Sequence, residues 1–325
     1  MSPSIIVSKT PLRIPLAGGL TDIRPYAEAF GGVTVSAAVD RYLYVVLKPN
    51  PGGAFELRYQ DTQEKAADGR HIRHDLVRES LRLTGLLDTP MTLHILADLA
   101  SESGLGASGA LTVSLLHAMH RFRGEEVPAA ELAREAGHIE VEVLEGASGY
   151  HDPTITALGG LKLIEYRGAE TAARDVVLSD ATRQRFIDSL LFFYSGRHAR
   201  TKPSLDLLSS RLPEAYEVLH ELKAIAYALE KAFGAGDLRR IAEIIGEQQT
   251  LKQRLPGKFV DDYVLDVTRR VREVGAYAQL PGGKISAFVI VACPDGQQQA
   301  VREALADLTE VHLGLEPAGT RALTL

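Results

Sequence analysis

Hydrophobic and polar positions change their spacing several times along the chain, and each change predicts a different kind of element. The first 60 residues include SIIVSKTPLRIPLAGG and GGVTVSAAVDRYLYVVLKP, which alternate and are rich in β-branched residues. This pattern is typical of strands joined by turns. Residues 71–87 have helical spacing, and MTLHILADLA (91–100) predicts a strand that leads into a glycine-rich loop. Helices are expected after that loop at 109–121 and, behind a proline, at 129–144.

The second part of the chain is mostly helical. GASGYHDPTITALGGLKLIEY (146–166) predicts a loop, a short helix and a strand, and the pattern then weakens over 170–188. The strand expected in SLLFFYSG precedes four helices and a closing strand–helix–strand unit. The elements expected in this part are helices at 204–212, 214–234, 236–254 and 258–275, a strand in ISAFVIVAC, a helix at 296–308 and a short final strand. We therefore predict an α+β protein of two lobes, residues 1–185 and 186–325.

Composition narrows the classes of function. The 325 residues are 45% hydrophobic, which is enough for a sizeable core. The net charge of −6 argues against nucleic acid or an anionic membrane as the main partner. The single cysteine, Cys293, excludes an internal disulfide, and it suits a reducing cytoplasm. The N-terminus lacks a signal-peptide pattern, and no apolar run approaches the roughly 20 residues that span a bilayer, so we expect a cytoplasmic protein.

A glycine-rich loop stands before the helix expected at 109–121. In ESGLGASGALTVSLLHAMH (102–120), three glycines precede an apolar helical pattern: Gly104, Gly106 and Gly109. Such a loop leaves backbone N–H groups at the positive end of a helix dipole, an arrangement that binds phosphate. A tight turn that only feeds a buried helix explains the pattern equally well. The loop is neither a Walker A motif, because the Lys-Ser/Thr ending is missing, nor a dinucleotide fingerprint, because the glycine spacing differs.

Two further stretches resemble, together with this loop, the GHMP kinase superfamily, which includes galactokinase, homoserine kinase, mevalonate kinase and phosphomevalonate kinase. KTPLRIPLAGGLTD (9–22) fills the first family motif with Pro11, Arg13, Gly18, Thr21 and Asp22. The loop matches the second motif through Gly104, Leu105, Gly106, Ser108 and Ala110, and departs from it at Ser101, Glu102 and Ala107. EVEVLEGASGYHDPTITALGG (140–160) resembles the third motif, with Asp152 at the position of the catalytic aspartate.

One subfamily, the D-glycero-D-manno-heptose phosphate kinases, resembles the chain over nearly its whole length. The segments that carry this resemblance are AGGLTDIRPYAEAFGGVTVSAAVDRYLYV, LFFYSGRHARTKPSL and LKQRLPGKFVDD. It implies a two-lobed GHMP kinase fold, with an N-terminal lobe like the second domain of ribosomal protein S5 and a helix-rich C-terminal lobe. The last glycine-rich motif departs most, since AQLPGGKISAFVIV keeps only Gly282 and Gly283.

The resemblance assigns roles to individual residues. It implies a phosphate-binding loop for ATP, a Mg²⁺ site and a catalytic pair. The ATP loop would comprise Ser103, Gly104, Leu105, Gly106, Ala107, Ser108 and Gly109. Ser108 and Glu140 would hold Mg²⁺, although Ser108 could instead cap the helix. Asp152 would accept the proton of the attacking hydroxyl, and Arg13 would keep it ionised.

The residues that would bind the acceptor substrate are less clearly identified by the sequence than those of the ATP loop and the catalytic pair. The resemblance points to substrate contacts at Gly19, Thr21, Asp22, Tyr194, Arg197 and Arg200. Lys284 lies where the chain departs from the last family motif, and it could supply a positive charge to a phosphate or simply belong to a loop that has drifted. Arginines suit a substrate that already carries a phosphate, but Arg197 and Arg200 could also be ordinary surface residues. Glu142 and Glu145 are explained by a solvated acidic face.

These features predict an ATP- and Mg²⁺-dependent kinase for a hydroxyl, the anomeric 1-OH, of a higher sugar phosphate such as D-glycero-D-manno-heptose 7-phosphate. Three alternatives stay open. They are a kinase for an eight-carbon sugar phosphate in lincosamide-type antibiotic synthesis, a non-catalytic sugar or nucleotide sensor on the same fold, and a decarboxylase like diphosphomevalonate decarboxylase. The expected partners are ATP and the sugar phosphate, without nucleic acid or membrane, and a homodimer is possible. The exact sugar, its anomer and the pathway do not follow from the sequence.

Overall fold

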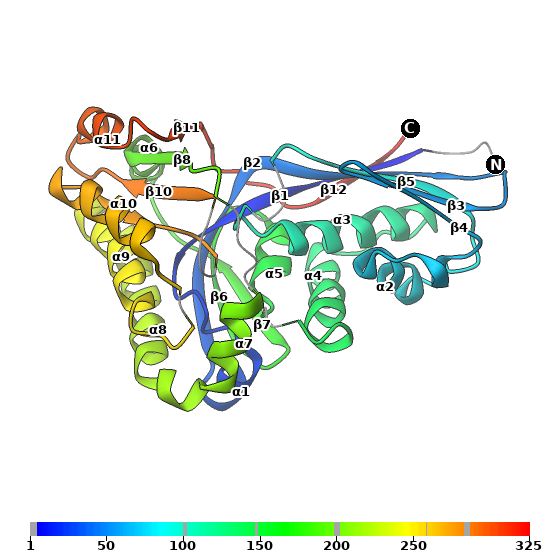
Figure 1. Cartoon of the computed structure of the whole chain (residues 1–325), viewed down its shortest axis with the longest axis horizontal. Coiled ribbons are helices and arrows are strands. Elements are labelled where there is room, and N and C mark those ends of the chain that lie inside the picture. Colours follow the sequence, from blue (N-terminus) through cyan, green and yellow to red (C-terminus); the bar gives the residue numbers. More distant parts are fainter. Residues whose placement is uncertain (1–4, 100–102, 147–148, 198–201, 258, 283–286) are drawn as a thin grey trace.

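A large sheet of eight strands is the main structural element of the described residues (Figure 1). The computed structural model describes residues 5–99, 103–146, 149–197, 202–257, 259–282 and 287–325. The sheet has the order β12-β1-β2-β5-β3-β4, and β6 and β7 continue it from β2. Its strands are β1 (Ile6–Ala17), β2 (Gly32–Pro49), β3 (Phe55–Tyr59), β4 (Thr62–Ala66), β5 (Met91–Ala97), β6 (Leu161–Arg167), β7 (Glu170–Asp175) and β12 (Arg321–Thr324). The long strand β2 pairs with β6 through its first part and with β5 through its last part.

Helices cover one face of this sheet. Figure 1 shows α2, α3, α4 and α5 side by side beneath it. Their bounds are Asp75–Leu83, Ala107–Phe122, Ala129–Gly137 and His151–Leu158, with a short 3-10 turn at Gly69–His71 and a π-helical turn at His138–Val143. The helix α1 (Arg24–Phe30) follows β1 and packs near β6. The helices α3 and α5 both lie against β1.

The second lobe has a small antiparallel sheet of order β11-β8-β10-β9, surrounded by helices. Its strands are β8 (Leu190–Tyr194), β9 (Tyr277–Gln279), β10 (Phe288–Ala292) and β11 (Thr309–Glu310). Its helices are α6 (Asp180–Ser189), α7 (Lys202–Ser210), α8 (Leu212–Ala235), α9 (Leu238–Lys252), α10 (Asp262–Glu273) and α11 (Gln298–Ala304). One hydrophobic cluster joins both lobes, since it contains Leu16 of β1, Leu115 of α3, Phe233 of α8 and Ile290 of β10.

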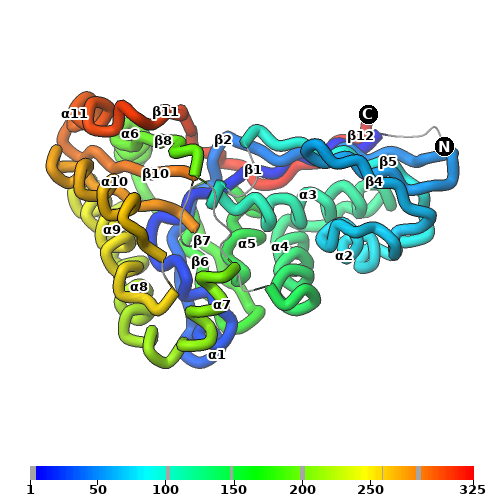
Figure 2. Tube along the Cα trace, viewed as in Figure 1, coloured from blue at the N-terminus to red at the C-terminus, as the bar shows by residue number. Residues whose placement is uncertain are grey.

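The predicted α+β fold with a helix-rich C-terminal region is confirmed. The sequence did not show, however, that the end of the chain returns to the N-terminal sheet. Residues Ile6–Lys9 pair with β12, so the last strand lies in the first sheet (Figure 2). We expected residues 321–324 in the C-terminal part, and that expectation is corrected for this strand. The division near residue 185 otherwise stays a prediction.

Several short elements differ from the sequence expectations for physical reasons. The strand β7 is exposed at all six positions, so it has no hydrophobic alternation to recognise. The helix α6 (Asp180–Ser189) begins in the weak region 170–188, and its N-cap residue is Ser179, whose side chain accepts a hydrogen bond from the Thr182 N–H. The segment 129–144, expected as one helix, is α-helical only as far as Gly137, and a π-helical turn at His138–Val143 follows. None of the described helices combines the length and hydrophobicity needed to cross a membrane.

Candidate functional site

A bidentate ion pair joins the two predicted catalytic residues. Arg13 lies on β1 and is 7% exposed, and Asp152 lies in the first turn of α5. The Arg13 Nε and Nη2 donate to the two carboxylate oxygens of Asp152 over 2.7 and 2.8 Å. Burial alone would raise the pKa of Asp152, but the charge of Arg13 and hydrogen bonds from His151 and Arg13 outweigh it and hold the pKa well below its usual range. Asp152 is therefore ionised at neutral pH.

The same arginine holds the glycine-rich loop. Its Nη1 donates to the Gly104 carbonyl over 2.6 Å, and the Arg13 backbone N–H donates to the Leu105 carbonyl over 3.0 Å. Gly104 and Gly106 have φ values of 80° and 76°, a conformation that side chains rarely adopt. A Cβ on Gly106 would also lie 2.9 Å from the Arg13 Cγ. The glycines thus let the loop turn sharply and approach Arg13.

The loop delivers an uncapped helix end to this pair. Gly106 is the N-cap residue of α3, and no side chain caps the helix within the described residues. Gly109 lies in the first turn, where an added Cβ would be 2.7 Å from the Asp152 Cβ. The N-terminal amide groups of α3 therefore lie beside Asp152, where they can receive an anion. The alternative role, a turn that feeds a buried helix, is also fulfilled, because the interior of α3 is buried.

Glu140 and Ser108 face each other beside this helix end. Glu140 lies on the π-helical turn, is 6% exposed, and its Oε1 has no hydrogen-bond partner among the described residues. Burial raises the pKa of Glu140 to about 7, although hydrogen bonds with Thr112 and Ser108 oppose the rise. A buried carboxylate oxygen without a partner fits a hard cation. The described residues contain no cluster of three His, Cys, Asp or Glu side chains that could hold a metal, so phosphate and water oxygens would have to complete the ligand set.

The other two acidic residues of this region have different surroundings. Glu142 is exposed and accepts a hydrogen bond from the Tyr150 hydroxyl over 2.9 Å, and Glu145 is exposed as well. Their surroundings agree with a solvated acidic face.

The predicted acceptor residues of the first motif have unequal surroundings. Asp22 is 8% exposed, and its Oδ2 accepts a hydrogen bond from the His151 N–H over 3.3 Å. Burial raises the pKa of the Asp22 carboxyl, with the positive field of His151 opposing and Asp152 adding. The Thr21 hydroxyl is fully buried and lies within 2.8 Å of the Gly18 and Val33 carbonyls, so it stabilises the turn. Gly19 lies beside the Gln248 amide.

The predicted acceptor residues of the second lobe are less well gathered. Tyr194 ends β8, and its ring packs against that of Phe288 at an interplanar angle of 53°. The Arg197 guanidinium lies 4.3 Å from the centre of the Tyr263 ring and 3.8 Å from the Asp261 carboxylate. Arg197 thus packs on α10, and its contact with a substrate stays a prediction. Arg200 and Lys284 lie outside the described residues.

Sequence reasoning missed two buried groups at the site. The His151 Nδ1 lies 3.2 Å from the Asp152 Oδ1, and the Nε2 has no hydrogen-bond partner among the described residues. Lys252 is 4% exposed, and its Nζ donates to the Leu280 and Gly282 carbonyls over 2.8 and 3.2 Å. His151 directly precedes the predicted base, which was a usable signal. Lys252 lies in LKQRLPGKFVDD, one of the segments that carry the subfamily resemblance, but the sequence analysis assigned it no role.

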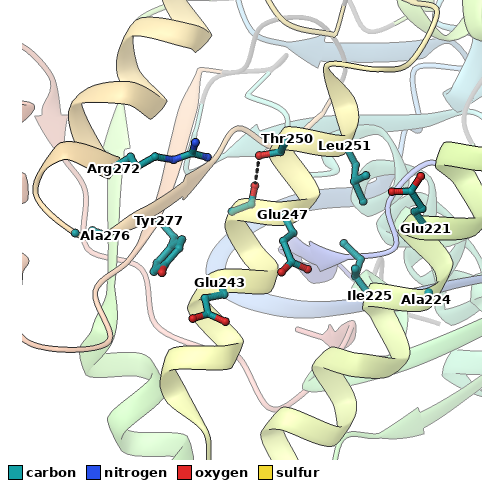
Figure 3. A pocket seen from close by; sticks show the side chains of 12 residues that line it. Glu221, Ala224, Ile225, Glu243, Glu247, Thr250, Leu251, Arg272, Ala276 and Tyr277 are labelled. Carbon is teal, nitrogen blue, oxygen red and sulfur yellow. Dashed lines mark hydrogen bonds between the residues drawn. The ribbon is translucent and has the colours of Figure 1, made fainter.

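A groove elsewhere on the second lobe lies apart from these residues. Figure 3 shows it between α8, α9 and the end of α10, with Glu243 and Glu247 along α9 and Tyr277 opposite. None of the predicted site residues lines it. The predicted catalytic residues and the glycine-rich loop lie instead at the junction of β1, α3 and α5.

Comparisons with known proteins agree with the fold. Residues 72–160 match the family model of the GHMP kinases N terminal domain. The D-glycero-alpha-D-manno-heptose 7-phosphate kinase of Campylobacter jejuni is 23% identical over 291 residues, which are 86% of each chain. A crystal structure of a D-glycero-D-manno-heptose 1-phosphate kinase from Bacteroides thetaiotaomicron has a TM-score of 0.81 at 20% identity and covers 98% of this chain and 99% of its own. The phosphomevalonate kinase of Streptococcus pneumoniae, in complex with phosphomevalonate and AMPPNP, has a TM-score of 0.76 at 14% identity over 98% and 99%.

Proposed function

We propose that this chain, which carries the N-terminal domain of the GHMP kinases and shares their fold over its length, is an ATP- and Mg²⁺-dependent kinase of a sugar phosphate. The enzyme class follows from the family, whose members transfer phosphate from ATP to hydroxyl groups of small molecules. The metal, the acceptor and the residue roles are our proposal.

One observation carries the assignment of the catalytic centre. A single guanidinium, that of Arg13, binds the Asp152 carboxylate with two nitrogens and the Gly104 carbonyl with the third. The predicted base and the predicted ATP loop are thereby fixed relative to each other. Phosphoryl transfer depends mainly on such positioning and on neutralisation of charge, rather than on covalent help from the protein.

The chain's own residues then have distinct tasks. The loop 104–109 and the amides of α3 would bind the ATP phosphates. Ser108 and Glu140 would hold Mg²⁺, which neutralises phosphate charge when bound. Asp152 would accept a hydrogen bond from the attacking hydroxyl. Because its pKa lies below the usual range, it is a weak base and takes the proton only as the new O–P bond forms.

The acceptor is proposed from chemistry and from relatives. Asp22 is buried within hydrogen-bonding distance of the backbone beside Asp152, where it could bind sugar hydroxyls. The Campylobacter jejuni relative is named as a heptose 7-phosphate kinase. We propose the anomeric 1-OH of a higher sugar phosphate as acceptor, with D-glycero-D-manno-heptose 7-phosphate as the first compound to test and an eight-carbon sugar phosphate as the second.

The test is ADP release with a panel of phosphorylated and free aldoses, with Asp152→Asn as the inactive control. Loss of one charge-assisted contact costs about 1.5–3 kcal/mol. We therefore expect the free sugar to be a poorer substrate than its phosphate by roughly ten- to a hundredfold in kcat/KM. Equal turnover of both would reject the sugar-phosphate assignment. Absence of ADP release with every sugar, combined with tight ATP binding, would favour a sensor.

A further inference from the structure

Lys252 is a buried cation whose charge is not matched by a carboxylate. It is the last residue of α9, and among the described residues its Nζ forms no ion pair and binds only the two backbone carbonyls of Leu280 and Gly282. An ammonium group has three hydrogens, so two carbonyl contacts leave one donor for another acceptor. A buried charge normally requires a paired partner, because desolvation is costly. A buried ammonium group with a donor left over is chemically suited to bind an anion.

The position of Lys252 points to the catalytic centre. The Gln279 amide, one residue before Leu280, donates to the Pro15 carbonyl over 2.7 Å, which ties the end of β9 to β1 two residues beyond Arg13. Burial lowers the pKa of Lys252 to about 8, and the positive charge of Arg13 contributes to the fall. The two cations are therefore near neighbours. Arg13 is neutralised by Asp152, whereas Lys252 keeps its charge at neutral pH.

The side of α9 that carries Lys252 is built to hold it in place. The Gln249 Oε1 accepts the Leu280 N–H over 2.9 Å, so α9 binds both the N–H and the carbonyl of Leu280. The Gln248 Oε1 accepts the Gly18 N–H over 2.9 Å from the other direction. These bonds hold the end of α9 against both lobes, while the ammonium group itself is held by its own bonds to the Leu280 and Gly282 carbonyls.

We propose that Lys252 binds a phosphate oxygen of the reactants at the junction of the two lobes. The inference rests on the proposed kinase function and adds a residue to it. Two phosphates have this chemistry: the phosphoryl group in transfer and the phosphate that the acceptor already carries. A role limited to clamping Leu280 is the competing explanation, and the variants below separate the two.

The central comparison is between Lys252→Met and Gln249→Met. Both variants remove one clamp on Leu280, but only the first removes a charge. Lys223→Met is a second control, because the Lys223 Nζ also donates to a backbone carbonyl, that of Phe30, on an exposed surface. Binding of tripolyphosphate, measured by calorimetry, needs no knowledge of the sugar. We expect Lys252→Met to weaken it by roughly ten- to a hundredfold, which is the usual value of a charge-assisted contact, and both controls to retain it.

Kinetics on the active enzyme identify the phosphate. A fall in kcat with little change in either KM assigns Lys252 to the phosphoryl group in transfer. A rise in KM for the sugar phosphate alone, with turnover of the free sugar unchanged, assigns it to the acceptor's phosphate. Lys252→Arg should recover part of the lost function because it keeps the charge. If no sugar is turned over by the wild type, the kinase proposal fails, while tripolyphosphate binding still tests Lys252.

Two results would overturn the proposal. The first is Lys252→Met with wild-type affinity for tripolyphosphate together with wild-type kcat and KM for the sugar phosphate. The second is an equal loss in Gln249→Met. If Lys252→Met does not fold, the wild-type protein provides the measurement. The ¹⁵Nζ resonance of Lys252, assigned by its absence from the spectrum of Lys252→Arg, should shift when tripolyphosphate is added. An unchanged resonance rejects the contact.

Discussion

Gly109 offers a direct test of how closely α3 and α5 approach each other at the proposed catalytic centre. An alanine in a helix is normally preferred to glycine by about 0.5–1 kcal/mol. At Gly109, however, the new Cβ would lie 2.7 Å from the Asp152 Cβ and 2.8 Å from both the Asp152 carbonyl carbon and the Pro153 nitrogen. Carbon atoms in contact prefer about 3.5–4.0 Å. Two of the three neighbours are backbone atoms, so the two helices would have to move apart by roughly 1 Å.

The expected cost of Gly109→Ala follows from this displacement. Overpacking of this kind costs about 1–3 kcal/mol, which outweighs the gain in helix preference. Moving Asp152 by roughly 1 Å from the acceptor hydroxyl should lower kcat by about 10². Gly234→Ala is the matched control, because Gly234 lies in α8 and its nearest neighbour, the Val177 carbonyl oxygen, is 4.0 Å away. This control should be as stable as the wild type or more stable, by up to about 1 kcal/mol.

Urea unfolding and steady-state kinetics on both variants measure these effects. The reasoning predicts that the two glycine-to-alanine changes alter stability in opposite directions and that only Gly109→Ala reduces turnover. If Gly109→Ala were as stable and as active as Gly234→Ala, the close approach of α3 to Asp152 would be wrong.

Three further predictions concern the same centre. Asp152→Asn should lower kcat by about 10²–10⁴ with little change in ATP affinity. In the double variant the loss from Arg13→Lys should not add to this loss, because Arg13 acts through Asp152. A near-normal kcat in Asp152→Asn would leave this residue an orienting group only. ATP with Mg²⁺ should raise the unfolding temperature, and EDTA should abolish most of that rise; equal shifts with and without metal would remove Ser108 and Glu140 from the Mg²⁺ site. Because burial raises the pKa of Glu140 from 4.5 to about 7, the metal-free native state binds more protons than the unfolded state between these values, and stability should fall as pH rises through this window. The fall should reach up to about 3 kcal/mol, and urea unfolding in EDTA at pH 5 and pH 8 should show it in the wild type but not in Glu140→Gln; an unchanged slope in the variant would assign the pH dependence elsewhere.

The family motifs were recognisable in the sequence because they are short and depend on local backbone geometry. Gly104 and Gly106 adopt positive φ in the loop, as a sharp turn before a helix requires. The predicted pairing of Arg13 with Asp152 is present as a bidentate contact between residues 139 positions apart. The roles of these residues in catalysis and ligand binding remain predictions. The α+β fold was correctly inferred from the periodicity of the elements, and the resemblance read from the order of the motifs agrees with the match of residues 72–160 to the model of the GHMP kinases N terminal domain.

Features that depend on partners distant in the sequence were not predictable from local pattern. The residues next to Gly109 in the sequence do not show that Asp152 lies against it. The burial of Lys252 at the end of α9 likewise depends on the Leu280 and Gly282 carbonyls, which are about 30 residues away in the sequence. The π-helical turn that carries Glu140 likewise continues a regular helical pattern in sequence.

The sequence by itself determined which chemical groups this protein carries and which local conformations its segments favour, because both are properties of short segments. Only the tertiary structure decided which groups act together. Burial shifts the pKa values of Glu140 and Lys252, and Arg13 offsets burial at Asp152. These effects depend on distances in space and on exclusion of water, and folding sets both by bringing β1, α3, α5 and α9 to one point.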